Sequence, residues 1–412
     1  MEKKKVLLVG DHPFLFTGNG NMMSTMLDQI NWNQFDVSCF LIGDLDPRSF
    51  SMYDKLEVPW IPAASMGAGD RYGYKKLISV LKRNKIDILL FVGIDIFTYS
   101  PAFDAIKKVQ ERNPFQWTVI APYDATFARG DHIQWFHYPD HVLVYSKYGF
   151  DKLSKYVDNV KYFRPKLAYS ENYTPLSKED KQSIQDTMFG MDTSDKVIFG
   201  FIGPNQKRKN IPRMMKGIND FLASGRTDVL FYLHMDIGQG RYNIPQLISD
   251  YKNLEGLTFY NSGDFKVSPM EMSRLYNCLD FYMLFSHQEG LSWTPLEAML
   301  TGVPCLLSDT TAHKDFIPNA IFVEQNETDH LLQQTEFGTG HVETRACSSN
   351  SIFHALRKAY DMKKNSEEGS EEYDTLVRNG KKFADEWVKG CDNINDFLNE
   401  IKDTKNTKLE LI

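Results

Sequence analysis

The 412-residue chain lacks the features that mark membrane proteins, secreted proteins and proteins that coat nucleic acid. No segment reaches the roughly 18 consecutive apolar residues of a membrane-spanning helix, and the apolar run after the basic N-terminus is too short for a signal peptide. The five cysteines are scattered and show no metal-ligand spacing, which favours a reducing compartment. A net charge of −7 argues against a dense basic face for nucleic acid. We therefore expect a cytoplasmic protein, with peripheral attachment to a membrane left open.

The composition and length are those of a folded protein with more than one domain. Apolar residues make up 42% of the chain and charged residues 25%, which excludes a mostly disordered protein. At roughly 150 residues per domain, the length predicts two or three domains. Short apolar runs alternate with longer amphipathic stretches, which is typical of β-α units around parallel sheets. The expected fold class is therefore α/β.

Two series of such units are predicted, one in each half of the chain. In the first, strands are expected at residues 5–9, 36–41, 86–91, 118–121 and 141–145, and helices at 21–29, 74–83, 102–111 and 147–155. In the second, strands are expected at 197–202, 229–235, 257–260, 280–284, 304–308 and 320–323, and helices at 211–223, 244–253, 269–278 and 295–300. Beyond about residue 350 the chain is mostly helical, with a solvated loop predicted at 363–372. The polar stretch at 166–195 interrupts the pattern, so we place the domain boundary there.

The most specific segment spans residues 257–309 and has at its centre the letters SHQEGLSWTPLEAM, from Ser286 to Met299. A strand is predicted to end near Phe285 and a helix to begin near Pro295, since proline is favoured at the first helical position. The loop between them presents backbone N–H groups near a helix N-terminus, which suits a diphosphate or a sugar hydroxyl.

Two carboxylates bracket this loop, and the spacing alone leaves their roles open. Thr294 and Glu297 fit a capping box, in which the glutamate hydrogen-bonds the N–H of the capping residue. Glu289 follows a strand and precedes a glycine, where an ordinary solvated acid is common. Each carboxylate also lies where it could bind a ligand.

A second motif reads GPNQKRKN from Gly203 to Asn210, between a predicted strand and a predicted helix. Ligands of open α/β sheets gather at the carboxyl ends of the strands, so a glycine turn with basic residues there suits phosphate. Three adjacent basic residues are, taken alone, more often a solvated surface.

Two features of the first half are weaker. Gly18 and Gly20 follow the first strand, where glycines allow close approach of a ligand, but the dinucleotide fingerprint is incomplete and a plain tight turn fits equally. Asp124 follows the strand predicted at 118–121, and acceptor binding and a turn role are equally open for it.

The segment around Glu289 resembles the donor-binding core of retaining GT-B glycosyltransferases. That large family, the group 1 glycosyl transferases, includes sucrose synthase-like and mannosyltransferase enzymes. The resemblance rests on Ser286, Glu289-Gly290, Pro295-Leu296, Glu297-Ala298-Met299 and Gly302-Val303-Pro304, which fall at the family's positions and spacing. Arg208 and Lys209 match a common form of its second motif, Asn-Gln-x-Arg-Lys-Asn. Where the family usually has Phe-Gly, this chain has Leu291-Ser292, which leaves the sugar's identity open.

The resemblance implies two Rossmann-like domains that face each other across a cleft. Residues 1–175 would form the acceptor domain, 176–195 a linker, and 196–385 the nucleotide-sugar donor domain. A C-terminal helix within 386–412 would return to the first domain. The implied reaction moves a sugar from a nucleoside-diphosphate sugar, a UDP- or GDP-sugar, to an acceptor hydroxyl with retention of configuration. Neither a metal nor another cofactor would take part.

The resemblance also implies roles for individual residues. Arg208 and Lys209 would neutralise the departing diphosphate, and Glu289 would contact the donor sugar. Glu297 would hydrogen-bond the ribose, and Gly20 would face the phosphates. The remaining donor-binding residues would be Asn205, Gly290, Leu291, Ser292 and Trp293. Many members have a histidine in the stretch equivalent to residues 120–124, where this chain has none, and Asp124 in that stretch could contact the acceptor.

The acceptor itself stays undetermined. A glycan, a lipid-linked sugar, a protein and a small molecule all fit, while the acidic balance disfavours nucleic acid. Two other functions of the same fold also remain open. One is a catalytically silent nucleotide-sugar-binding or scaffold protein, and the other is another nucleotide-sugar enzyme such as an epimerase.

Overall fold

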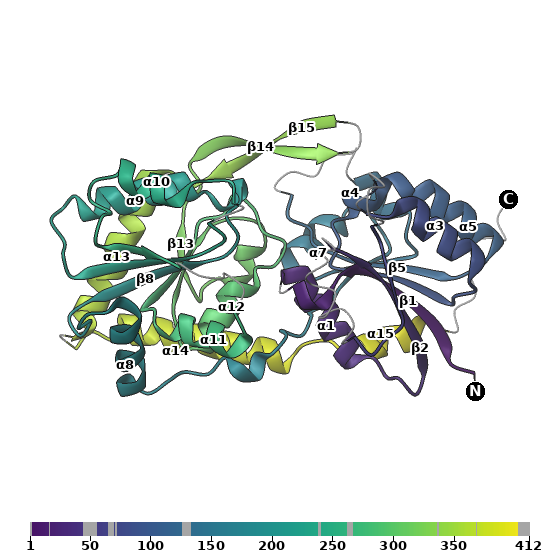
Figure 1. The fold of residues 1–412 in the computed structure, drawn as a ribbon, viewed down its shortest axis with the longest axis horizontal. Coiled ribbons are helices and arrows are strands. Elements are labelled where there is room, and N and C mark those ends of the chain that lie inside the picture. Colours follow the sequence, from purple (N-terminus) through teal and green to yellow (C-terminus); the bar gives the residue numbers. More distant parts are fainter. Residues whose placement is uncertain are drawn as a thin grey trace. The chain divides into compact units, whose positions relative to one another are not determined.

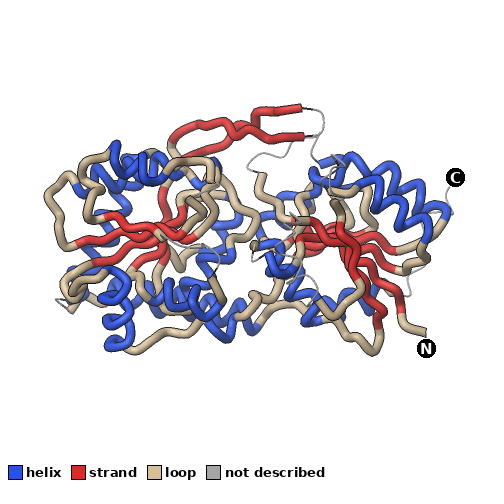
Figure 2. Tube along the Cα trace, in the orientation of Figure 1, coloured by secondary structure: helices blue, strands red, loops and turns tan. Residues whose placement is uncertain are grey.

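The computed structural model describes residues 2–15, 17–43, 56–64, 70, 72–125, 133–237, 240–261, 267–335, 338–367 and 369–402. The chain divides into two compact units. The first unit comprises residues 1–168, 334–338 and 390–412, and the second comprises residues 169–333 and 339–389. In each unit helices flank a central sheet (Figures 1 and 2).

The first unit is built on a seven-stranded parallel sheet in the order β3-β2-β1-β4-β5-β6-β7. Its strands are β1 (Lys4–Asp11), β2 (Phe35–Ile42), β3 (Trp60–Pro62), β4 (Ile88–Val92), β5 (Gln116–Ala121), β6 (His141–Val144) and β7 (Val160–Tyr162). Its α-helices are α1 (Gly18–Gln29), α3 (Tyr74–Arg83), α4 (Ile96–Tyr99), α5 (Phe103–Arg112), α7 (Lys147–Leu153) and α15 (Ile394–Ile401). Short 3-10 helices lie at Pro13–Leu15, Ser100–Ala102 and Gln134–His137.

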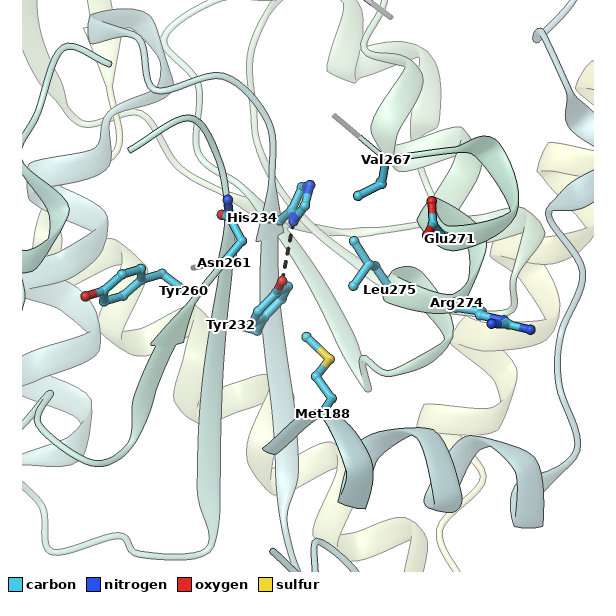
Figure 3. Close-up of a pocket in the computed structure, with 9 residues that line it drawn as sticks. All are labelled: Met188, Tyr232, His234, Tyr260, Asn261, Val267, Glu271, Arg274 and Leu275. Atoms are coloured by element: carbon cyan, nitrogen blue, oxygen red, sulfur yellow. Dashed lines mark hydrogen bonds between the residues drawn. The ribbon is translucent and has the colours of Figure 1, made fainter. Parts of the chain in front are cut away.

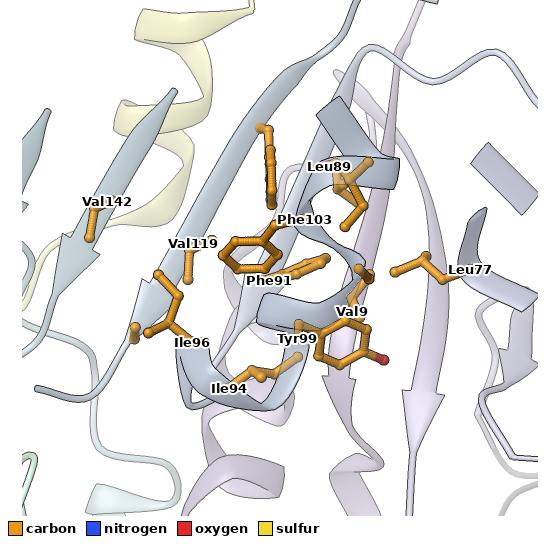
Figure 4. Close-up of a cluster of buried hydrophobic side chains, with 14 of the residues drawn as sticks. Val9, Leu77, Leu89, Phe91, Ile94, Ile96, Tyr99, Phe103, Val119 and Val142 are labelled. Atoms are coloured by element: carbon orange, nitrogen blue, oxygen red, sulfur yellow. The ribbon is translucent and has the colours of Figure 1, made fainter. Parts of the chain in front are cut away.

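The core of this unit lies where α3 and α5 cover one face of the sheet (Figure 1). Strands β4 and β5 are buried along their whole length, as apolar strands covered on both faces should be. Phe103 of α5 packs edge-on against Trp117 of β5, with ring centroids 4.9 Å apart. Figure 4 shows Phe91 and Val119 of the sheet meeting Phe103 and Tyr99 in the same cluster.

Helix α15 packs against α1 on the other face of this sheet (Figure 1). The Asn395 side chain accepts a hydrogen bond from the Asn31 backbone N–H at 2.7 Å and donates one to the Gln29 carbonyl at 2.5 Å. Lys161 of β7 pairs with Glu400 at 2.5 Å. The end of the described chain is therefore fastened to the first unit by direct contacts.

The second unit has a six-stranded parallel sheet in the order β10-β9-β8-β11-β12-β13. Its strands are β8 (Val197–Ile202), β9 (Val229–His234), β10 (Thr258–Tyr260), β11 (Phe281–Leu284), β12 (Cys305–Ser308) and β13 (Ile321–Val323). Its α-helices are α8 (Lys178–Phe189), α9 (Ile211–Leu222), α10 (Ile244–Asp250), α11 (Pro269–Asn277), α12 (Trp293–Leu300), α13 (Ser349–Glu367) and α14 (Glu372–Lys389), and 3-10 helices lie at Ser170–Asn172, Lys207–Lys209 and Thr311–Phe316. Both sheets contain the Rossmann order 3-2-1-4-5-6, so the predicted α/β class with Rossmann-like units is confirmed.

Every strand predicted above is present, with ends that shift by at most two residues. The sequence contains no signal for β3 and β7, which are three-residue strands at the two edges of the first sheet. It also gave none for β14 (Glu327–Thr335) and β15 (Gly338–Ala346), which pair only with each other. Both strands of this hairpin are rich in polar residues, so neither shows the apolar pattern by which strands are recognised.

The loop predicted at residues 363–372 is shorter than expected, because α13 continues to Glu367 and α14 begins at Glu372. The lysines on which the prediction of a solvated loop rested contact other residues of the second unit. The Lys363 ammonium lies 4.4 Å from the centroid of the Tyr373 ring, and Lys364 donates to the Asp195 carbonyl at 3.0 Å. Helix α8, which falls in the segment predicted as a linker, also belongs to the second unit.

Asp280 fastens several elements of the second unit together at the start of β11. Its carboxylate is buried and accepts a hydrogen bond from the Ile198 N–H at 2.9 Å. Lys181 of α8 lies 3.0 Å away and Lys363 of α13 lies 3.7 Å away. Burial by itself would raise the pKa of Asp280, but the two lysines and the N–H outweigh it and hold the pKa below its ordinary value.

We predict that Asp280→Ala lowers the free energy of unfolding by about 3 kcal/mol, because it leaves two lysines facing a vacated buried site. Urea denaturation measures this loss. The matched control is Asp220→Ala, which removes the exposed Lys216–Asp220 pair and should cost less than about 0.5 kcal/mol. Because the folded-state pKa of Asp280 is depressed, its contribution is present at neutral pH and is lost as acid protonates it. Equal losses in the two variants would contradict this role.

Candidate active site

The two sequence motifs of the second half meet at one edge of the second sheet. The basic motif follows β8 and the glutamate motif follows β11, and these two strands are parallel neighbours. Their carboxyl ends therefore lie side by side, and the His287 N–H donates to the Arg208 carbonyl at 2.8 Å. The fold thus joins two loops that are about 80 residues apart in the chain.

The three predicted catalytic residues, Arg208, Lys209 and Glu289, form one charged cluster at this edge. The Lys209 ammonium lies 2.5 Å from Oε1 of Glu289, and the Arg208 guanidinium lies 2.7 Å from the same oxygen. Lys209 and Glu289 are each only 5% exposed, whereas Arg208 is partly open to solvent. The alternative of a solvated loop acid and a solvated basic face is therefore wrong for this pair.

The cluster alters the proton affinity of its members. Burial would raise the pKa of Glu289, but Arg208 and Lys209 outweigh it and hold that pKa well below its ordinary range. Burial and the neighbouring Arg208 lower the pKa of Lys209 to about 8, although Glu289 acts in the opposite direction. Glu289 is therefore a permanent anion, and the partly exposed Arg208 is the cation with most access to an incoming ligand.

A residue without a sequence signal holds the Glu289 backbone. Thr311, at the start of a 3-10 helix (Thr311–Phe316), accepts a hydrogen bond from the Glu289 N–H at 2.8 Å and donates to the Glu289 carbonyl at 2.9 Å. Both contacts fix the direction in which the Glu289 side chain leaves the loop. They join residues 22 positions apart, beyond the range of any local pattern.

Ser292 has a backbone conformation that side chains rarely adopt. Its φ is +71°, and a non-glycine residue in such a region is strained by on the order of 1–3 kcal/mol. Its hydroxyl lies 3.0 Å from Nε2 of His313, which is completely buried. No pattern in the sequence points to His313. The sequence does show its partner, Ser292, at a position where the family that the segment resembles usually has glycine.

The remaining loop residues occupy different environments. Leu291 is buried, whereas Gly290 in the loop and Trp293, the first residue of α12, are half-buried. Asn205, which was grouped with the donor-binding residues, uses its side chain within the protein. Its amide donates to the Tyr242 carbonyl at 2.7 Å, and its oxygen accepts from the Tyr242 N–H at 3.1 Å.

Glu297 lies inside α12 and has no capping role. The helix begins at Trp293, close to the predicted start near Pro295, but its N-cap, Ser292, makes no side-chain capping bond, so the predicted capping box is wrong. Glu297 is instead buried and accepts a hydrogen bond from the Tyr276 hydroxyl at 2.7 Å. Burial raises the pKa of Glu297 to about 7, while hydrogen bonds from Tyr276 and Tyr173 lower it.

A cavity of about 440 Å³ opens at the ends of β9 and β10 (Figure 3). Its floor includes Tyr232 and His234 of β9, whose side chains are 3.4 Å apart, and its walls include residues of α11. The full lining is Met188, Tyr232, His234, Tyr260, Asn261, Val267, Glu271, Arg274 and Leu275. The size is within the range of small-molecule sites.

The two candidate residues of the first half lie in the first unit. Gly20 is in the first turn of α1, where its N–H donates to the capping Thr17 hydroxyl at 3.0 Å. A Cβ there would come within 2.9 Å of the His12 carbonyl, so packing alone requires glycine. Asp124 follows the carboxyl end of β5 and is half-buried.

The root of the β14–β15 hairpin is attached beside the basic loop. Arg213, in the first turn of α9, pairs with Glu327 at 2.7 Å and with Asp329 at 2.8 Å. Lys207 donates to the His330 carbonyl at 2.7 Å. Arg213 and Lys207 thus contact the hairpin, whereas Arg208 and Lys209 contact Glu289.

Comparison with known proteins finds solved structures with a similar fold but no relative that matches by sequence. Neither a protein-family model nor a curated protein matches the chain. The HepE protein of Anabaena, solved in complex with UDP and glucose, is 12% identical with a TM-score of 0.67, over 96% of this chain and 100% of that one. The chain has the GT-B fold.

Two further GT-B structures agree with this assignment. Sucrose-phosphate synthase from Thermosynechococcus elongatus is 13% identical with a TM-score of 0.69, over 97% of both chains. WaaG, a glycosyltransferase involved in lipopolysaccharide biosynthesis, is 12% identical with a TM-score of 0.64, over 92% of this chain and 95% of that one. Identities this low establish the fold alone.

Two absences apply to the described part of the chain. No helix there has both the length and the apolar character to cross a membrane. No group of three or more His, Cys, Asp and Glu side chains there is arranged to hold a metal ion.

We predict that Glu289→Gln lowers the pKa of Lys209 below its value of about 8, because the carboxylate is what favours the ammonium. NMR titration of isotopically labelled lysine measures the midpoint, and Lys209→Arg identifies the resonance by its disappearance. Lys216, which pairs with Asp220 at the surface, serves as the internal reference. An unchanged Lys209 midpoint would show that the cluster is not electrostatically coupled.

Proposed function

We propose that this GT-B protein is a glycosyltransferase that moves a sugar from a nucleoside-diphosphate sugar to an acceptor hydroxyl. Configuration at the anomeric carbon is retained, and no metal takes part. The supporting observation is the cluster of Glu289, Lys209 and Arg208 at the edge where β8 and β11 end. A diphosphate leaving group needs fixed cations, and this cluster supplies them where the loops after two neighbouring strands meet. The second unit is then the donor domain and the first unit the acceptor domain.

The proposed role of the basic pair is electrostatic. When the bond between sugar and diphosphate breaks, negative charge grows on the phosphate oxygens. Cations already fixed in a site that excludes water stabilise that charge without reorganising. Arg208 would meet the phosphates directly through its exposed guanidinium, while buried Lys209 would contribute from behind it. Glu289 holds both cations and would approach the donor sugar from the same loop.

The nucleotide would occupy the region between this cluster and the cavity of Figure 3. Glu297 can accept hydrogen bonds beyond those from its tyrosine partners, because a carboxyl group keeps acceptor capacity in either protonation state. Ribose hydroxyls would donate to it. The base would lie in the cavity beside Tyr260 and Asn261. HepE, which shares the fold, was solved with UDP and with UDP-glucose, so a UDP-sugar is the first donor to test.

Acceptor activation needs no protein base in this scheme. The incoming hydroxyl approaches on the face from which the diphosphate departs, and the departing phosphate takes its proton. The new glycosidic bond forms as the bond from sugar to phosphate breaks, and configuration is retained. Asp124 and Gly20 remain our proposed contributions of the first unit to acceptor and phosphate binding.

The first test is thermal stabilisation by UDP, GDP, ADP, CMP and dTDP and their sugars, with and without EDTA. A ligand at about 100 times its dissociation constant adds about 2.7 kcal/mol to the stability of the folded state. We expect one base to raise the melting midpoint equally in both conditions. Transfer then has to release the free nucleoside diphosphate, which an epimerase does not. No response to any nucleotide would favour the scaffold.

Two substitutions separate the roles of the charged residues. Lys209→Ala should reduce transfer by on the order of 10²-fold, since a fixed stabiliser of the leaving group is lost. Glu297→Ala should mainly weaken nucleotide binding, which calorimetry measures directly. Wild-type turnover in the first variant would refute the assigned role, and an unchanged affinity in the second would remove Glu297 from the site.

A further inference from the structure

The strained residue Ser292 lies next to the charged cluster, three positions after Glu289. Its φ of +71° and ψ of 93° are readily adopted by glycine and not by a residue with a Cβ. It makes no capping bond to α12, so its hydroxyl does not serve the helix. Strained backbone conformations are concentrated at functional sites, so strain at Ser292 beside the charged cluster indicates a functional role for its side chain.

The hydrogen bonds behind Ser292 have a fixed direction. Nδ1 of His313 lies 3.0 Å from the Ser308 carbonyl and 3.2 Å from the Ser308 hydroxyl oxygen. That hydroxyl already donates its only hydrogen to the Ser286 carbonyl at 2.7 Å. Both neighbours of Nδ1 are therefore acceptors, so Nδ1 has to carry a proton.

The opposite nitrogen of the ring is then an acceptor. His313 is completely buried, and burial lowers its pKa to about 4, so the imidazole is neutral at pH 7. A neutral ring with a proton on Nδ1 has a lone pair on Nε2. The Ser292 hydroxyl, 3.0 Å away, therefore donates its hydrogen to His313.

This order leaves the oxygen of Ser292 with lone pairs only. The residue is only half-buried, and it belongs to the same loop as Glu289 and Gly290. A site whose hydrogen is committed elsewhere accepts a hydrogen bond and cannot donate one. Its natural partner in a donor site is a hydroxyl group.

We propose that Ser292 Oγ accepts a hydrogen bond from one hydroxyl of the transferred sugar and so selects donors that have it. His313 is the positioning residue that fixes the polarity of the serine. This proposal rests on the proposed function, because it assigns a specificity contact within the same donor site. Because Ser292 Oγ can only accept in this contact, a donor analogue that lacks the sugar hydroxyl loses the hydrogen bond.

The test compares each variant with single-hydroxyl analogues of the donor. The probes are UDP-glucose and its 2-, 3-, 4- and 6-deoxy forms, or the same series on the base that stabilises the wild-type protein. Ser292→Ala should lower kcat/KM for the parent sugar by about 10-fold, as expected for one hydrogen bond. For one deoxy analogue, wild type and variant should agree within about twofold, because the partner is absent on both sides.

Further variants exclude a folding explanation. Ser292→Gly removes the hydroxyl and also relieves the backbone strain, so it should show the donor selectivity of Ser292→Ala with a higher melting midpoint. His313→Asn should weaken the same preference among the deoxy analogues, because the serine hydroxyl can then rotate and is no longer fixed as an acceptor. Ser224→Ala is the control, since this exposed serine follows α9 at the opposite end of the sheet from the loops and should match wild type.

The outcomes distinguish this proposal from the function on which it rests. If the wild type transfers sugar but Ser292→Ala reduces all five donors equally, the hydroxyl is structural and the specificity role is refuted. The same conclusion follows if no donor is affected. If the wild type neither binds nor transfers from any donor, the proposed function fails, and the specificity contact is overturned with it.

Discussion

The buried contact between Lys209 and Glu289 is the interaction on which the whole candidate site depends. Taking two charges out of water is costly, and their attraction compensates only when the geometry is good and further hydrogen bonds are made. Here Arg208 adds a second cation, and Thr311 fixes the glutamate backbone from both sides. The site is therefore held in one arrangement before any ligand arrives.

That arrangement requires a rigid base, which the parallel sheet provides. Strands β8 and β11 are neighbours, so the loops that follow them leave the sheet together. Asp280 stabilises the start of β11 by accepting from the β8 backbone and from lysines of two helices. At the start of β11 the charged residue Asp280 stabilises the sheet. At the carboxyl ends of β8 and β11 the charged residues form the candidate site.

Much of the fold followed from local pattern, and the failures have local causes. The apolar runs of β8 and β9 were recognisable because both faces of these strands are covered by helices. The edge strands β3 and β7 were missed because three residues show no period, and the hairpin at 327–346 was missed because its residues are mostly polar. Spacing along the chain identifies both motifs. Spacing does not settle the role of Thr294 and Glu297, which also fit a capping box. The structure has a capping box at α11, formed by Ser268 and Glu271, and none at α12.

By itself the sequence determined the two series of β-α units and the place of both motifs at strand ends, because periodicity and turn chemistry act over a few residues. Only the tertiary structure decided how the side chains pair. Glu289 meets Lys209 across 80 residues, and Glu297 meets Tyr276 across 21. His313 reaches Ser292 across 21 residues and fixes which way its hydroxyl points. These contacts arise from the order of strands in the sheet, which brings distant loops to one edge and which no local pattern encodes.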